Sequence, residues 1–67
     1  MIEVTINGDR RQVEPGQTLA QFLHALRLEP RMVVVERNGE IVARDRLGET
    51  PITAGDTLEI VQMMAGG

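Results

Sequence analysis

The fold is decided by the stretch TLAQFLHAL at residues 18–26. Thr18 and Gln21 have the T-x-x-Q spacing of a capping box, in which the two residues satisfy free backbone N–H groups at the start of a helix. The apolar residues of this stretch recur at i, i+3, i+4 and i+7 and so share one helix face: Leu19, Phe22, Leu23 and Leu26. Pro30 prevents the helix from continuing, so the sequence predicts one amphipathic helix at about residues 19–27.

The segment before the helix has the alternation of a β-hairpin. Residues 2–6 alternate apolar and polar side chains, which is the pattern of a half-buried strand. Asn7-Gly8 then favours a tight turn, because both residues tolerate positive φ. The return strand, at about residues 9–14, is polar apart from Val13, and we expect it to lie at the edge of a sheet.

The segment after the helix contains three further candidate strands. Residues 32–36 include three consecutive valines, which are typical of an interior strand covered on both faces. Asn38-Gly39 turns this strand into a short one at residues 40–44, and we expect residues 45–54 to be irregular. Residues 57–62 alternate again and predict a final strand.

This order of elements predicts an α+β domain, in which one helix covers one face of a mixed sheet of four to five strands. A chain of 67 residues forms one small domain. We expect the domain to span residues 1–62 and to be followed by a flexible tail at residues 63–67. The aliphatic residues are expected in the core, because a chain this short needs nearly all of its apolar burial in order to fold.

The composition argues against several classes of function. The net charge is −3 and Phe22 is the single aromatic residue, so the chain lacks the basic surface and the stacking residues of a nucleic-acid binder. Cys, Ser and Lys are absent and His24 stands alone, so we expect no metal site, no bound cofactor and no catalytic residue. No apolar run approaches the roughly 18 residues of a membrane span, and the start of the chain lacks the pattern of a secretory signal. We expect a cytoplasmic protein that is a monomer when free.

The sequence stops at Gly66-Gly67, shortly after the last predicted strand. Residues 63–67 can extend by about 17 Å, which is enough to carry a terminal carboxylate into another protein's buried active site. Glycine suits this place because a narrow channel can close around a backbone that has no Cβ atoms. We therefore expect Gly67 to be the reacting residue, with Gly66 and Ala65 needed for entry into the partner's active site.

A carboxylate becomes an acyl donor only after activation. A partner enzyme would convert it to a mixed anhydride by attack on the α-phosphate of ATP, and a nucleophile would then displace AMP to give a thioester, an amide or a thiocarboxylate. The partner would supply positioning and electrostatic stabilisation. Three functions stay open on this basis: a group carrier, a protein modifier joined through Gly67 to lysines of its targets, and a non-covalent interaction domain with an idle tail.

The last strand also indicates where a partner would bind. If Leu58 and Ile60 point into the core, alternation places Val61 and Met63 on the opposite face. Methionine is flexible and suits a surface that must fit two unlike partners. Val61, Met63 and Met64 are therefore candidate partner-binding residues, and for Met63 packing in the core is an equal alternative.

Three segments carry a resemblance to a known family: residues 35–42 (VERNGEIV), residues 55–61 (GDTLEIV) and the terminal Gly66-Gly67. Over the whole chain, the sequence resembles the ubiquitin-like (β-grasp) sulfur carriers, and among them the ThiS family of thiamine biosynthesis. The resemblance implies that an adenylating, ubiquitin-activating-like enzyme activates Gly67 with ATP. It also implies that a sulfur donor protein helps to form a thiocarboxylate there, and that thiazole synthase receives the sulfur. A sister carrier, the small subunit of molybdopterin synthase, is the alternative within the same fold.

Overall fold

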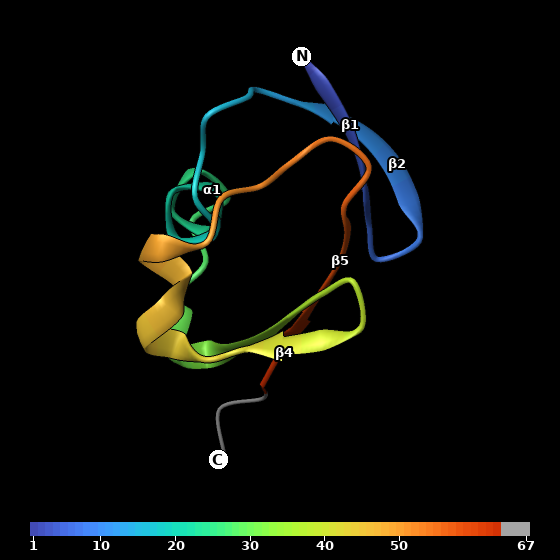
Figure 1. The fold of residues 1–67 in the computed structure, drawn as a ribbon. Coiled ribbons are helices and arrows are strands. Elements are labelled where there is room, and N and C mark those ends of the chain that lie inside the picture. Colours follow the sequence, from blue (N-terminus) through green and yellow to red (C-terminus); the bar gives the residue numbers. More distant parts are fainter. Residues whose placement is uncertain (64–67) are drawn as a thin grey trace.

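The structure is a computed structural model that describes residues 1–63. Its strands and helices are, in chain order, β1 (Ile2–Ile6), β2 (Asp9–Val13), α1 (Leu19–Ala25), the 3-10 helix η1 (Pro30–Met32), β3 (Val33–Arg37), β4 (Glu40–Val42), the 3-10 helix η2 (Arg44–Glu49) and β5 (Thr57–Gln62). The strands form one sheet in the order β2-β1-β5-β3-β4, with β1 and β5 parallel and the other neighbours antiparallel (Figure 1). The predicted fold class, a mixed sheet packed on one α-helix, is confirmed, and β2 is an edge strand as expected.

Helix α1 begins where the capping box predicts. The Gln21 backbone N–H donates to Thr18 Oγ1 at 3.2 Å, and the Thr18 backbone N–H donates to Gln21 Oε1 at 2.9 Å. The helix ends at Ala25, slightly earlier than predicted, because Arg27 has a left-handed φ of 60° that turns the chain away. The prediction that Leu26 belongs to the buried stripe is wrong: it is the C-cap residue, and the residue is 43% exposed.

The core lies between α1 and the inner face of the sheet. Its buried apolar residues come from every strand except β4, from α1 and from the segment that precedes β5: Val4, Ile6, Val13, Leu19, Phe22, Leu23, Val33, Val35, Leu47, Ile52, Leu58 and Ile60. Helix η2 lies next to α1 and contributes Leu47 (Figure 1). The segment at residues 45–54, expected to be irregular, therefore begins with part of a 3-10 helix and supplies two core residues.

The outer face of the sheet is largely exposed, and this corrects the prediction for β3. The strand is interior in the sheet, between β5 and β4. Only Val33 and Val35 are buried, however, whereas Val34 between them is half-buried. Consecutive strand residues point to opposite faces, so Val34 belongs to the face opposite the helix.

A polar cluster joins the β3–β4 turn to the start of β5. Asp56 is 4% exposed, and its carboxylate accepts hydrogen bonds from Arg37 Nε at 2.9 Å, Asn38 Nδ2 at 3.1 Å and the Thr53 backbone N–H at 2.8 Å. Burial raises the pKa of Asp56, but the hydrogen bonds from Arg37, Thr53 and Asn38 outweigh it and lower this pKa from 3.8 to about 2. The cluster fixes the turn from which β5 begins.

Within residues 1–63, no helix has both the length and the apolar character needed to cross a membrane.

Candidate functional site

Strand β5, which leads into the predicted tail, is the central strand of the sheet. It pairs with β3 through five residues, as far as Val33 opposite Gln62, and with β1 on its other side. The Met63 backbone N–H continues the β3 ladder by donating to the Met32 carbonyl oxygen at 2.7 Å. The chain is thus held by neighbours up to the last residue that the structure describes.

The side chain of Asn7 lengthens the contact between β1 and β5. The parallel register contains only two pairs, Thr5 with Thr57 and Ile6 with Leu58. Beyond it, Asn7 Nδ2 donates to the Ile60 carbonyl oxygen at 3.2 Å, and the Ile60 backbone N–H donates to Asn7 Oδ1 at 2.8 Å. The amide group therefore satisfies both polar groups of one β5 residue, as a neighbouring strand would.

Asn7 is able to do this because it takes a left-handed φ of 49° in the turn after β1. Asparagine tolerates this conformation better than most residues. The local sequence indicates only the turn for Asn7, because its second role depends on Ile60, 53 positions away in the chain.

An apolar patch lies on the outer face of the sheet, next to the end of β5. Leu58 and Ile60 are buried, whereas Val61 is 56% exposed, as alternation predicts. Val61 pairs across the strands with the half-buried Val34. Ile41, on β4, is 69% exposed and pairs with Glu36, which shares the outer face with Val34. We call Val34, Ile41 and Val61 the outer patch.

Met63 borders the outer patch. The residue is 42% exposed, so it is not a core residue, and it lines a hollow together with Val34, Ile41 and Arg44. The alternation along β5 indicates Val61 and Met63, whereas Val34 and Ile41 lie on β3 and β4 and were not predicted. The signal for Ile41 was available, because the tight turn at Asn38-Gly39 fixes the register of β3 and β4 and hence the face of each β4 residue.

Two glutamates stand opposite each other on the same outer face. Glu36 and Glu59 are register partners of β3 and β5, and neither forms an ion pair or a side-chain hydrogen bond within residues 1–63. Like charges at directly opposite positions are unfavourable in a sheet. The free protein therefore carries an acidic pair, beside the outer patch, that a cationic group of another molecule would neutralise.

The remaining predicted site residues, Met64, Ala65, Gly66 and Gly67, lie outside the described residues. The same holds for most of the predicted tail at residues 63–67. Among residues 1–63 no cluster of three or more His, Asp or Glu side chains could hold a metal ion. His24 lies on the exposed side of α1.

Comparison with known proteins gives a match to the family model described as "ThiS family", over residues 4–67. This chain belongs to the ThiS family. The match spans nearly all of the sequence, including the segment after β5, and it confirms the resemblance drawn from the sequence.

Relatives of two kinds are similar to this ThiS-family chain. "Sulfur carrier protein ThiS" of Bacillus subtilis is 38% identical over 63 residues, which cover 92% of this chain and 96% of that protein. "Thiazole synthase" of Paramagnetospirillum magneticum is 36% identical over 66 residues, which cover 98% of this chain but 20% of that protein. "Thiazole synthase" of Magnetococcus marinus is 33% identical over 66 residues, which cover 98% of this chain and 20% of that protein. This chain therefore spans about one fifth of the length of these two relatives.

Solved structures confirm the fold. The crystal structure of the thiamine biosynthesis protein ThiS from Geobacter metallireducens matches with a TM-score of 0.82 and 30% identity, covering 98% of this chain and 100% of that one. A designed protein based on ubiquitin matches with a TM-score of 0.51 at 20% identity, which supports the ubiquitin-like fold alone.

Proposed function

We propose that this ThiS-family chain is a sulfur carrier that works through the carboxylate of Gly67. The observation that carries the proposal is the family match, which continues past the central strand β5 to the terminal Gly66-Gly67. The pairing of β5 with β1 and β3 up to Met63 supports it, because the point from which the tail starts is then fixed. A partner that binds the folded domain would find the tail at a constant position.

Gly67 would be loaded with sulfur in two steps. In the first, a Gly67 carboxylate oxygen attacks the α-phosphorus of ATP in an adenylating enzyme, which forms the acyl-adenylate and releases pyrophosphate. In the second, a hydrosulfide equivalent supplied by a sulfur donor protein attacks the carbonyl carbon, a C–S bond forms, and AMP leaves with the electrons of the broken C–O bond. The product is a C-terminal thiocarboxylate. ATP is bound by the partner, and this chain supplies the reacting group.

We infer that thiazole synthase accepts the sulfur, so that the chain acts in thiamine biosynthesis. The chain is similar to ThiS sulfur carriers and to thiazole synthases, and this supports thiazole synthase as the acceptor over molybdopterin synthase. In two of these relatives a segment like this chain forms part of a protein named thiazole synthase. A carrier-like segment and a synthase within one polypeptide would meet in every catalytic cycle.

The outer patch and Met63 are the surface that we assign to the partners. They lie on the outer face of the sheet, on β5 and on the neighbouring strands β3 and β4, so a partner that holds the tail after β5 would cover them as well. Glu36 and Glu59 extend this surface with negative charge. A partner with an aliphatic ridge flanked by arginine or lysine would complement both parts.

The test is intact-mass analysis after incubation with the adenylating enzyme, ATP and a sulfide source. We expect a mass increase equal to the exchange of one oxygen for sulfur, located at Gly67 by fragmentation. The matched control is the same chain with one alanine appended after Gly67, which should stay unmodified. Sulfur incorporation that is equal in the two proteins would refute the assignment of Gly67.

A further inference from the structure

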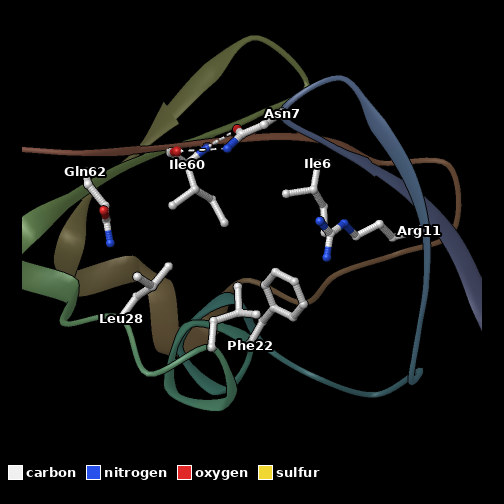
Figure 2. Close-up of a pocket in the computed structure, with 8 residues that line it drawn as sticks. Ile6, Asn7, Arg11, Phe22, Leu28, Ile60 and Gln62 are labelled. Carbon is white, nitrogen blue, oxygen red and sulfur yellow. Dashed lines mark hydrogen bonds between the residues drawn. The ribbon is translucent and has the colours of Figure 1, made fainter.

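A cavity of about 340 Å3 lies between the end of α1 and the inner face of the sheet, on the side of β2 (Figure 2). It exists because β1 turns away after Ile6, whereas β5 continues to Gln62. The register between these two strands ends at Ile6 and Leu58. The inner-face side chains of β5 beyond Leu58 therefore have no β1 residue beside them on that side.

The wall of the cavity is mostly apolar. Its apolar side chains come from β1, α1, the segment after α1 and β5: Ile6, Phe22, Leu26, Leu28 and Ile60. Leu26 is the residue that the helical pattern assigns to the core and that the structure leaves exposed at this wall. Cavities of about 300 to 1,000 Å3 with apolar walls and a few polar groups are the usual form of a binding pocket.

Arg11 is the one charged residue among the described residues that line this cavity. It lies opposite Val4 in the β1–β2 register, so it stands on the inner face of the sheet, where an apolar residue is usual. Figure 2 shows its side chain reaching from β2 over the cavity towards Phe22 and Ile6. Within residues 1–63 its guanidinium has no ion pair and no side-chain hydrogen bond.

The other polar groups of the cavity differ in availability. The amide of Asn7 is used by its two hydrogen bonds to Ile60. The side chain of Gln62 lines the cavity and makes no hydrogen bond within the described residues. Gln62 is the last residue of β5 and directly precedes Met63. An unpaired guanidinium and a carboxamide above an apolar wall match an apolar side chain that has a carboxylate next to it.

We propose that this cavity receives a segment of a partner protein in which a large aliphatic side chain is flanked by an aspartate or glutamate. The aliphatic group fills the space against Phe22 and Leu28, and the carboxylate pairs with Arg11. A free small acid fits less well, because the cavity is open at Leu26 and Arg11 and would leave much of a small ligand in water. A segment of a partner protein would be shielded from water on its open side by the rest of the partner.

The inference rests on the proposed function in one respect, the identity of the partner. Because Gln62 directly precedes Met63, a protein that holds the tail lies within reach of the cavity. Such a protein would contact both faces of the sheet near the end of β5. The outer patch would give one contact, and the cavity would give a second one on the helix side.

The experiment titrates the isotope-labelled full chain by NMR with the capped tripeptide aspartyl-leucyl-aspartyl amide. The neutral peptide asparaginyl-leucyl-asparagine amide and the free acid 4-methylpentanoate are the comparison ligands. The variants are Arg11→Gln and its matched control Arg10→Gln, which removes the same charge from the neighbouring position on the opposite face of β2. The titration does not involve sulfur loading. A negative result here therefore leaves the carrier function intact, and a failure of sulfur loading would leave the cavity proposal intact.

We expect the acidic peptide to shift the backbone signals of Phe22, Leu28 and Gln62 in a saturable way. Its binding should weaken about fivefold in Arg11→Gln, which is the effect of losing one exposed ion pair, and stay unchanged in Arg10→Gln. Equal binding of the acidic and neutral peptides, or equal effects of the two variants, would overturn the proposal. Arg11 would then be a charged residue that protects the edge strand β2 from pairing with other chains. Binding of 4-methylpentanoate as tight as that of the peptide would overturn the choice of a protein segment.

Discussion

Arg37 Nε lies 2.9 Å from the carboxylate of Asp56, a residue 19 positions further along the chain, and this contact joins the β3–β4 turn to the start of β5. The carboxylate is almost completely buried and accepts further hydrogen bonds from Asn38 and Thr53. The geometry explains why the pKa of Asp56 falls to about 2.

The first prediction concerns stability against pH. Because the folded pKa of Asp56 is lowered from 3.8 to about 2, the ionised group stabilises the fold above pH 3.8, and this contribution is lost as the pH falls towards 2. Asp56→Asn should lower the free energy of unfolding by about 2 kcal/mol at neutral pH. Urea titrations of both proteins measure the difference, which should shrink across this pH window. A difference that stays constant down to pH 2 would contradict the assignment.

The second prediction concerns the contact between Asn7 and Ile60. Asn7→Gly keeps the left-handed φ accessible and removes both hydrogen bonds, so the free energy of unfolding should fall by about 1 to 2 kcal/mol. Asn7→Ala should cost about 1 kcal/mol more, because alanine is strained at this φ. Hydrogen exchange gives the local readout: the amide of Ile60 should exchange faster relative to that of Val35. Unchanged protection of Ile60 in the glycine variant would show that the side chain is not needed to hold β5.

The third prediction concerns the outer patch. Val61→Gln should change the free energy of unfolding by less than about 0.5 kcal/mol, because the side chain is largely exposed. Its affinity for the adenylating enzyme should fall about tenfold, the usual range for an apolar contact near the centre of an interface. Thr57→Gln is the matched control, on the same face of β5 but at its other end. Calorimetric titration of both variants decides the matter, and equal affinities would remove Val61 from the interface.

The fourth prediction concerns the acidic pair. Glu59→Gln removes the repulsion with Glu36 and should raise the free energy of unfolding by about 0.2 to 0.5 kcal/mol at low salt. The gain should shrink at high salt, where the charges are screened. The same change should slow association with a cationic partner surface, which stopped-flow mixing measures. If the variant is more stable but associates at the wild-type rate, Glu36 and Glu59 have no role in partner binding.

Local signals in the sequence predicted the elements well. The capping box at Thr18 and Gln21 placed the start of α1 correctly, and alternation placed β5 at residues 57–62, as observed. These patterns depend on neighbouring residues only. The same is true of the exposed position of Val61.

The features that local patterns do not predict depend on the turn after α1 and on contacts between distant parts of the chain. Leu26 has helical spacing, but the early turn at Arg27 leaves it at the rim of a cavity. Leu47 lies in a segment without periodicity and becomes buried because η2 packs against α1. The three valines of β3 predict burial on both faces, but no local pattern shows that Val34 is only half-buried and that no second layer covers it within residues 1–63.

The parallel arrangement of β1 and β5 has a mechanical consequence. Force applied between the N-terminus and the end of β5 would act along the two strands, so their hydrogen bonds, including those of the Asn7 amide, would bear the load together instead of opening one by one. A load between these two points would therefore have to break several hydrogen bonds at the same time.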